Sequence, residues 1–326
     1  MPDRLQTAVG AGTGALAGKA VVITGAGRGL GAAYARHAAH LGAAVIVNDI
    51  DARRAEQSAQ RIVAQGGRAI AAPGDVSSWD FADRLVASCV EAFGTISGLV
   101  NNAGILRPAR LEDLSETDLR QMLAVNLVGT IACARAAVLR MRRLGLGGSI
   151  VNVASGAQAG DIALGAYGAT KGAVASLTYS WAMELRGSGI RMNAVSPLAE
   201  TDMARQNAHL MAAQAAAREV QYAALPDPDI SAPVVSFLLS DAAAPVTGQV
   251  VRIAGRLLSY VSHPMIAAPV LEDDWSFARV SEAFSRTLTA RQHKLGLAFA
   301  DAGASTPVGS EQRPATGRAG KRKGRA

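Results

Sequence analysis

The sequence predicts an α/β fold built as a single Rossmann-type, doubly wound parallel sheet of about seven strands with helices on both faces. Short apolar runs alternate with longer helical patterns along most of the chain, which is typical of parallel strands joined by crossover helices. A glycine-rich loop also separates the first run from the first helix. The apolar runs lie near residues 20–23, 44–48, 69–72, 98–101, 149–154, 190–195 and 249–253.

Four segments are expected along the chain. Residues 1–17 lack an apolar signal core, so we expect a flexible leader and a cytoplasmic protein. Residues 18–260 carry the alternating pattern and form the Rossmann-type domain. Residues 261–308 include an apolar helix around Trp275 and Phe277, which predicts an appendage packed on the core or on a neighbouring subunit. Residues 309–326 are expected to be a disordered basic tail.

Composition limits the partners of this 326-residue chain. Its net charge of +7 comes mostly from the tail, where six basic side chains face one acidic side chain. Such a tail can bind nucleic acid without sequence preference, although we favour a solvated tail. No segment approaches 18 consecutive apolar residues, so we expect no contact with membrane. Cys89 and Cys133 are expected to be buried, reduced thiols, and the five histidines suggest no metal site.

The glycine-rich loop, Thr24 to Gly31, predicts a dinucleotide site. It follows a strand and opens a helix, so its backbone can approach a pyrophosphate at the helix N-terminus. Asp49 ends the next strand, where a carboxylate can bind ribose hydroxyls and repel a 2′-phosphate. We therefore expect NAD as the cofactor, although Arg28 could also clamp a phosphate. The expected contacts of this region are Gly25, Arg28, Gly29, Leu30, Gly31 and Asp49.

Tyr167 and Lys171 predict the catalytic chemistry. Positions i and i+4 share one face of a helix, so the ammonium of Lys171 can lie near the phenol of Tyr167. A phenol with an ordinary pKa of about 10 is a poor base, and a nearby cation lowers that pKa toward a working range. Ser155 follows a buried strand and is expected at its carboxyl end, where ligands bind in such sheets. These three residues predict a proton shuttle for an alcohol or a ketone.

Together these motifs resemble the classical short-chain dehydrogenase/reductase family over roughly residues 18 to 260. The resemblance implies an NAD-dependent oxidoreductase, in which Asn126 holds a water and completes a tetrad with Ser155, Tyr167 and Lys171. It also implies that the nicotinamide carboxamide meets the segment after the sixth strand, although Leu198 stands where the family usually has glycine. The further cofactor contacts that it implies are Asp75, Val76, Asn102, Ala103, Gly104, Pro197 and Thr201.

The substrate is less clearly indicated than the reaction. Several stretches are similar to the (3R)-hydroxyacyl-CoA dehydrogenase unit of multifunctional β-oxidation enzymes, which implies a 3-hydroxyacyl thioester. The glycine-rich insertion of that unit is missing here, so a hydroxysteroid or another apolar alcohol stays open. A catalytically silent, NAD-responsive binding protein is a further alternative. We expect Gln158, Leu198 and a helical segment within residues 199–225 to select the substrate.

Two helices predict self-association. The helix from about Glu116 to Leu144 and the helix after Tyr167 carry apolar residues on more than one face, and one sheet face cannot cover both stripes. In the family that this chain resembles, these helices pair with their symmetry mates. We therefore expect a homodimer or a homotetramer.

Overall fold

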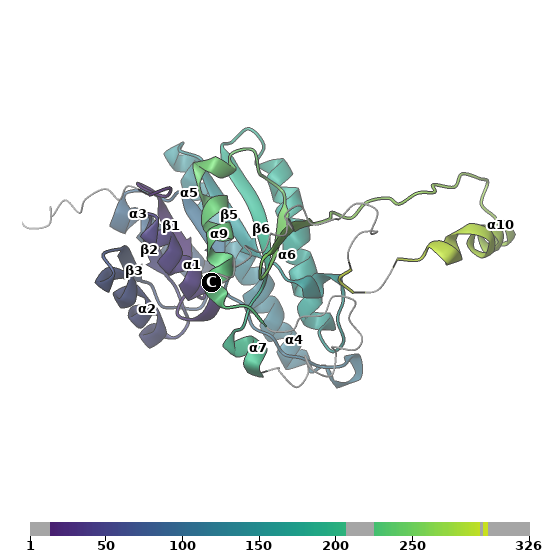
Figure 1. Ribbon diagram of the computed structural model, residues 1–326, viewed down its shortest axis with the longest axis horizontal. Coiled ribbons are helices and arrows are strands. Elements are labelled where there is room, and N and C mark those ends of the chain that lie inside the picture. The colour runs from purple at the N-terminus through teal and green to yellow at the C-terminus, as the bar shows by residue number, and fades with distance from the viewer. Residues whose placement is uncertain (1–13, 207–224, 294–295, 299–326) are drawn as a thin grey trace, which may run out of the picture.

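The computed structural model describes residues 14–206, 225–293 and 296–298, and it contains one eight-stranded sheet (Figure 1). The strand order is β3-β2-β1-β4-β5-β6-β7-β8. The strands up to β7 pair in parallel, and β8 pairs with β7 in the antiparallel sense. The strands are β1 Ala20–Ile23, β2 Ala44–Val47, β3 Arg68–Ala71, β4 Gly98–Asn101, β5 Gly148–Val153, β6 Ile190–Leu198, β7 Val250–Ala254 and β8 Leu257–Val261.

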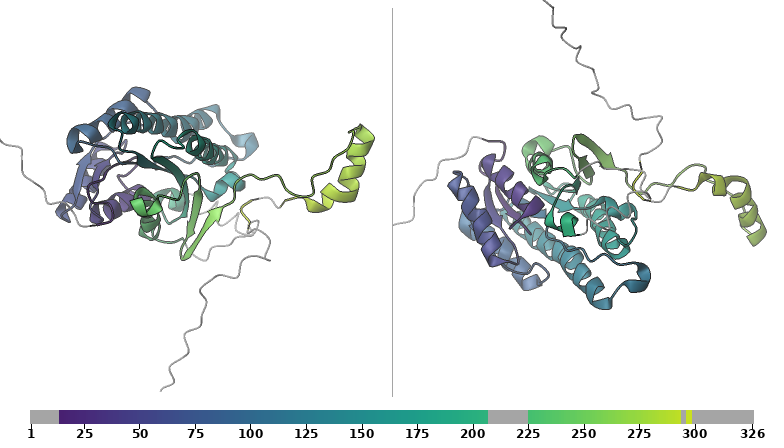
Figure 2. Two further views of the ribbon diagram at one scale, coloured as in Figure 1. Left: turned by 90° about the horizontal axis from the view of Figure 1, so that it is seen from above. Right: turned by 60° about the horizontal axis from the view of Figure 1, so that its bottom comes forward.

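Helices cover both faces of the sheet, which confirms the predicted fold class (Figure 2). One face packs on α1 (Gly29–His40), α2 (Ala52–Ala64) and α9 (Ala232–Leu239). The other packs on α3 (Trp79–Phe93), α5 (Gly129–Leu144) and α6 (Gly165–Glu184). Because β1 and β2 are buried on both faces, their sequences are continuously apolar. Shorter elements are α4 Glu116–Met122, α7 Asp202–Gln206, α10 Phe277–Ala283, the π-helical turns η2 Leu123–Val128 and η7 Phe284–Leu288, and the 3₁₀ turns η1 Leu111–Asp113, η3 Gly156–Ala159, η5 Pro228–Ser231, η6 Asp241–Ala243 and η8 Thr289–Arg291.

The seven predicted strands are present, and β8 is an additional one. A two-residue turn, Gly255 and Arg256, joins β7 to β8, and Gly255 has a φ of +59°. A two-residue loop with a left-handed glycine is a β-hairpin signal that the expectation of a purely parallel sheet overlooked. The hairpin places a mostly exposed strand at this edge of the sheet.

The core begins earlier than the predicted boundary at residue 18. Leu16 is fully buried in the cluster beneath α1, and its amide donates a hydrogen bond to the carbonyl of Leu41 at 2.9 Å. Residues 14–17 therefore belong to the domain rather than to a leader, because Leu16 fills space between the first helix and the sheet. Residues 1–13 and the predicted basic tail, 309–326, lie outside the described residues.

The predicted helix from Glu116 to Leu144 is one continuous rod formed by α4, η2 and α5. Over an 18-residue window its mean hydropathy is 1.8, which by length and composition alone is enough to cross a membrane. Half of that window is buried within the fold, much of it against α3 and the sheet. A core helix of a folded domain has these same properties, so the expectation of no membrane contact stays a prediction.

The segment after β8 stands away from the sheet and its helices (Figures 1 and 2). Phe277 of α10 is 91% exposed, and Trp275 and Phe284 are about half exposed. His263, just after β8, lies against Tyr179 of α6 with 4.1 Å between the ring centres. Further along, Gly296 and Leu297 contact the loop after β5. The predicted helix over residues 203–222 is seen only as α7, and residues 207–224 lie outside the described part of the chain.

Candidate active site

The carboxyl ends of the parallel strands bring the predicted catalytic residues to one edge of the sheet. Ser155 follows β5, which pairs in register with β6, and the amide of Ala154 donates to the carbonyl of Val195 at 2.8 Å. The Ser155 hydroxyl accepts a hydrogen bond from the amide of Ala157 at 3.2 Å and caps the short turn η3. This capping fixes the serine beside the first turns of α6.

Tyr167 and Lys171 lie on one face of α6, as their spacing predicts. The Lys171 ammonium is 5.8 Å from the centre of the Tyr167 ring, and it donates a hydrogen bond to the carbonyl of Val153 at 2.8 Å. Lys171 is only 4% exposed. A buried cation that is held by one carbonyl can stabilise a nearby phenolate or donate to a ligand.

The pKa shifts at this site differ in direction from the sequence-based expectation. Burial raises the pKa of Tyr167 to about 12, and its hydrogen bond with Ser155 only partly opposes this effect. Burial also lowers the pKa of Lys171 to about 8. The cost of burying charge therefore dominates over the attraction between the two groups. The spacing of the residues could predict their proximity, but not their desolvation.

Asn126 lies in the π-helical turn η2 and is fully buried. Its side-chain oxygen accepts a hydrogen bond from the amide of Ile105 at 2.8 Å, and its side-chain nitrogen donates to Ile105 and to the hydroxyl of Thr170. A π turn widens the helix locally and often occurs at functional sites. Asn126 thus joins the loop after β4 to the catalytic helix, one turn from Tyr167. The proposed role of holding a water stays a prediction.

The loop after β4 is hydrogen-bonded directly to the glycine-rich loop. The hydroxyl of Thr24 accepts hydrogen bonds from the amides of Asn102 and Ala103, both at 3.0 Å. The side chain of Asn102 donates to the carbonyls of Thr24 and Gly25. A Cβ on Gly25 would lie 2.8 Å from the Cα of Ala103, so glycine is required for this approach.

Asp49 is hydrogen-bonded to the glycine-rich loop, a contact that the sequence did not indicate. Its carboxylate accepts hydrogen bonds from the amide of Gly27 at 3.0 Å and from the amide of Asp51 at 3.1 Å. A Cβ on Gly27 would lie 2.7 Å from a carboxylate oxygen of Asp49. Gly27 is therefore a functional position that the motif spacing missed, because only the folded chain shows how closely the two loops approach.

Arg28 forms an ion pair with Asp202, so its guanidinium is not available to bind a phosphate in this arrangement. Its guanidinium is 2.5 Å from the carboxylate of Asp202, the first residue of α7. Thr201 lies beside the same loop, since a Cβ on Gly29 would be 3.7 Å from its methyl group. The predicted contact segment after β6 therefore faces the glycine-rich loop.

The other predicted cofactor residues lie mostly around the carboxyl edge of the sheet. Gly104 lies between two tetrad side chains, because a Cβ there would be 3.4 Å from the oxygen of Asn126 and 3.6 Å from the Lys171 nitrogen. Asp75 is exposed and Val76 is buried at the end of the loop before α3. Pro197 and Leu198 extend β6 and pair with β7, two or more residues beyond the predicted end of that strand. Leu30 packs partly against the core below α1, and Gly31 has no room for a side chain.

These residues fit a nicotinamide dinucleotide. Gly25 and Gly29 have φ values of +60° and +55°, which let the loop turn directly into the N-terminus of α1. A helix N-terminus favours a pyrophosphate, and Asp49 presents a carboxylate beside it. Lys171 and Tyr167 lie at the other end of the same edge, where a nicotinamide ribose and a substrate would meet.

Two further features were not anticipated from the sequence. A Cβ on Gly168 would lie 2.4 Å from the carbonyl of Ala157, so the glycine after Tyr167 lets α6 approach η3 closely. The side-chain oxygen of Gln158 is buried and accepts no hydrogen bond from the described residues. A buried acceptor without a donor costs about 1–3 kcal/mol and commonly marks the place of a ligand or a water.

Other chemistry receives no support from the described residues. They contain no group of three or more metal-ligating side chains that could hold an ion. Cys89 and Cys133 are free and buried, and burial raises the pKa of each thiol to about 12. Both cysteines are therefore inert packing residues.

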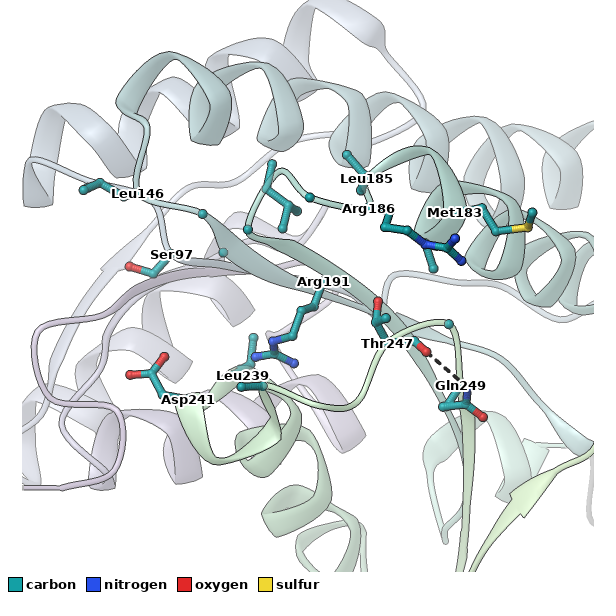
Figure 3. A pocket seen from close by; sticks show the side chains of 18 of the residues that line it. Ser97, Leu146, Met183, Leu185, Arg186, Arg191, Leu239, Asp241, Thr247 and Gln249 are labelled. Atoms are coloured by element: carbon teal, nitrogen blue, oxygen red, sulfur yellow. Dashed lines mark hydrogen bonds between the residues drawn. The ribbon is translucent and has the colours of Figure 1, made fainter.

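A cavity lies at the opposite edge of the sheet (Figure 3). It has a volume of about 710 Å³ and is lined by residues at the amino ends of the strands, including Ser97, Gly148 and Ile190. Arg191 on its wall donates hydrogen bonds to the carbonyls of Leu238 and Ser240 at the end of α9. None of the predicted catalytic or cofactor residues lines it, so we do not assign it to the reaction.

Comparisons with known proteins agree with this geometry. The family model described as short chain dehydrogenase matches residues 19–211. A hydroxy(phenyl)methylsuccinyl-CoA dehydrogenase subunit from Thauera aromatica is 35% identical, over 73% of this chain and 95% of its own length. An L-rhamnose 1-dehydrogenase (NAD(P)+) from Azotobacter vinelandii is 37% identical, over 73% and 96%. The crystal structure of a short chain dehydrogenase from Mycobacterium avium has a TM-score of 0.74 at 31% identity and covers 85% of this chain and 96% of its own.

Proposed function

Because this chain belongs to the short-chain dehydrogenase family, whose members are oxidoreductases of alcohol and ketone groups, we propose that it oxidises a secondary alcohol with NAD. The observation that carries the proposal is the joint placement of Ser155, Tyr167 and Lys171 beside a glycine-rich loop that fits a dinucleotide. The reverse reaction, reduction of the ketone, uses the same groups.

Each residue has a distinct role in the proposed mechanism. Ser155 donates a hydrogen bond to the substrate oxygen and stabilises the charge that develops there. Tyr167 removes the hydroxyl proton in the oxidative direction, and Asn126 holds a water that passes the proton on. When bound, the oxidised nicotinamide supplies the hydride acceptor. Lys171 holds the nicotinamide ribose and stabilises the Tyr167 phenolate.

The pKa directions predict a strong pH dependence for oxidation. Burial keeps Tyr167 protonated at neutral pH, so only a small fraction of the enzyme holds the phenolate. Turnover in the oxidative direction should rise with pH as that fraction grows. Lys171 begins to lose its charge near its lowered pKa of about 8, which limits the rise at alkaline pH.

The choice of NAD over NADP rests on Asp49. The residue is only 9% exposed and two backbone amides orient its carboxylate, so it cannot easily turn away from a 2′-phosphate. Arg28 is engaged by Asp202 and offers less help to such a phosphate. The Azotobacter relative is named for both cofactors, so the preference needs a direct measurement.

For the substrate we propose a 3-hydroxyacyl thioester, and a hydroxysteroid or another apolar alcohol is the alternative. The Thauera relative is named for a CoA thioester, which favours the first class. The loop after Ser155 is built from small residues, which leaves room for a bulky apolar group. Gln158 and Leu198 are the proposed selecting residues, and the buried oxygen of Gln158 offers an acceptor to a substrate donor.

The decisive experiment is a screen of NAD reduction against 3-hydroxyacyl-CoAs, hydroxysteroids and simple secondary alcohols. The variant Tyr167→Phe keeps the ring and removes the phenol, so its turnover should fall by about 10²–10⁴-fold while NAD still binds. Near wild-type turnover would remove Tyr167 from the mechanism. NAD binding without turnover on any alcohol would favour the silent, NAD-responsive binding protein.

We also propose a cytoplasmic homodimer or homotetramer. Apolar side chains on the two long helices stay exposed in a single chain: Leu139 is 48% exposed and Met183 is 69% exposed. A symmetric interface through α5 and α6 would cover them. Nucleic acid is not a proposed partner, apart from nonspecific binding by the basic tail.

A further inference from the structure

The last described residues of the chain return to the catalytic edge of the sheet. Gly296, Leu297 and Ala298 are half-buried, although α10 and the residues around it stand away from the core (Figure 1). Gly296 and Leu297 contact the loop that begins immediately after Ser155. More than a hundred residues separate this loop from Leu297 in the sequence, so no local pattern places them together.

The contact is close and depends on two glycines. A Cβ on Gly156 would lie 3.1 Å from a terminal carbon of Leu297, which is tighter than an ordinary van der Waals contact. A Cβ on Gly296 would lie 3.6 Å from the carbonyl of Gly160. Because positions 156 and 160 lack side chains, the C-terminal segment can rest directly on the backbone of this loop. The space that the small loop residues leave is therefore partly filled by Leu297.

This loop borders the place where a substrate must lie. Ser155 provides the hydroxyl that meets the substrate oxygen, and Gly156 is its immediate neighbour in the chain. On the sheet side, the guanidinium of Arg252 is 3.6 Å from the same Cβ position on Gly156 and donates hydrogen bonds to Ser196. The loop is thus supported by a charged group of the sheet, and it is bordered by an apolar side chain of the C-terminal segment.

We propose that Leu297 is a specificity-determining residue that forms an apolar wall of the substrate site. The wall contacts the substituent next to the carbinol carbon, and it selects an alkyl or ring group over a hydroxylated one. This inference rests on the proposed function, because it assigns the substrate class of the same site. It makes Leu297, which lies beyond the Rossmann-type domain in the sequence, part of the active site.

The variant Leu297→Ala tests the wall in the full-length enzyme. Removing a contact that is equal in the ground state and the transition state raises KM and leaves kcat nearly unchanged. The loss of apolar contact should lower kcat/KM for the preferred alcohol by about 10- to 100-fold, and the preference should shift toward bulkier alcohols. Leu288→Ala is the matched control, because it makes the same change in the outlying segment. A Leu297→Ala profile that equals that of the control across alcohols of increasing size would overturn the proposal.

A second measurement separates this inference from the proposed reaction. The double variant Gly156→Cys/Leu297→Cys should form a disulfide within one chain on mild oxidation, and the two native cysteines are too buried to interfere. The expected readout is a faster-migrating monomer on a non-reducing gel. Absence of that bond, or a bond between two chains, would refute the placement of Leu297. If the disulfide forms in the variant but the wild-type enzyme oxidises no alcohol, the contact stands and the proposed reaction is refuted instead.

Discussion

Replacing Lys171 by methionine should stabilise the fold while it removes activity. Burial lowers the pKa of this lysine from 10.5 to about 8, and each pKa unit corresponds to about 1.36 kcal/mol. Carrying the charge in the folded state therefore costs roughly 3 kcal/mol below that pKa. The substitution also removes the hydrogen bond to the Val153 carbonyl, which costs about 1–2 kcal/mol. We expect Lys171→Met to be about 1–2 kcal/mol more stable than the wild type near neutral pH.

The gain should depend on pH in a defined direction. Between about 8 and 10.5 the unfolded chain still binds a proton at Lys171 and the folded chain does not, so wild-type stability rises with pH in this window. The methionine variant lacks this contribution. Its advantage should therefore be fully present below about pH 8 and should shrink and then disappear as the pH rises toward 10.5.

Urea unfolding at fixed protein concentration measures the effect, because a change in oligomer dissociation would otherwise mix with it. Lys19→Met is a matched control, since Lys19 forms an ion pair with the exposed Asp241 and is not deeply buried. This control should change the free energy of unfolding by no more than about 0.5 kcal/mol. A methionine variant at position 171 that is less stable than the wild type near neutral pH, or a gain that is independent of pH, would show that burial of the charge is not costly. Turnover of the variant should fall by at least about 100-fold.

Three further predictions concern the cofactor, the tail and the assembly. Asp49→Ser should narrow the ratio of kcat/KM for NAD to that for NADP, and a wild-type enzyme that already prefers NADP would contradict the argument from Asp49. Deleting residues 309–326 should leave activity and melting temperature unchanged, and a marked fall in melting temperature would show that the tail is part of the fold. Light scattering coupled to size exclusion at micromolar concentration should give a dimer or a tetramer, whereas a stable, active monomer would mean that Leu139 and Met183 need no partner.

The sequence alone determined most of the strands and the parallel, doubly wound class of the sheet. Strands that are buried on both faces of a parallel sheet are mostly apolar, so β1 and β2 are visible as continuous runs without any knowledge of the fold. The glycine-rich loop and the spacing of Tyr167 and Lys171 are equally local, because turn geometry and helix periodicity act over a few residues. These patterns were sufficient to place the candidate site at the carboxyl edge of the sheet.

Tertiary structure decided the properties that depend on distant parts of the chain. The direction of the pKa shift of Tyr167 follows from how deeply the fold buries it, which its neighbours in sequence do not reveal. The hydrogen bond from the Gly27 amide to the Asp49 carboxylate requires two loops to meet. The contact of Leu297 with Gly156 joins segments that are far apart in the sequence. Periodicity and spacing report interactions within one element, whereas desolvation and long-range contacts exist only once the elements have packed together.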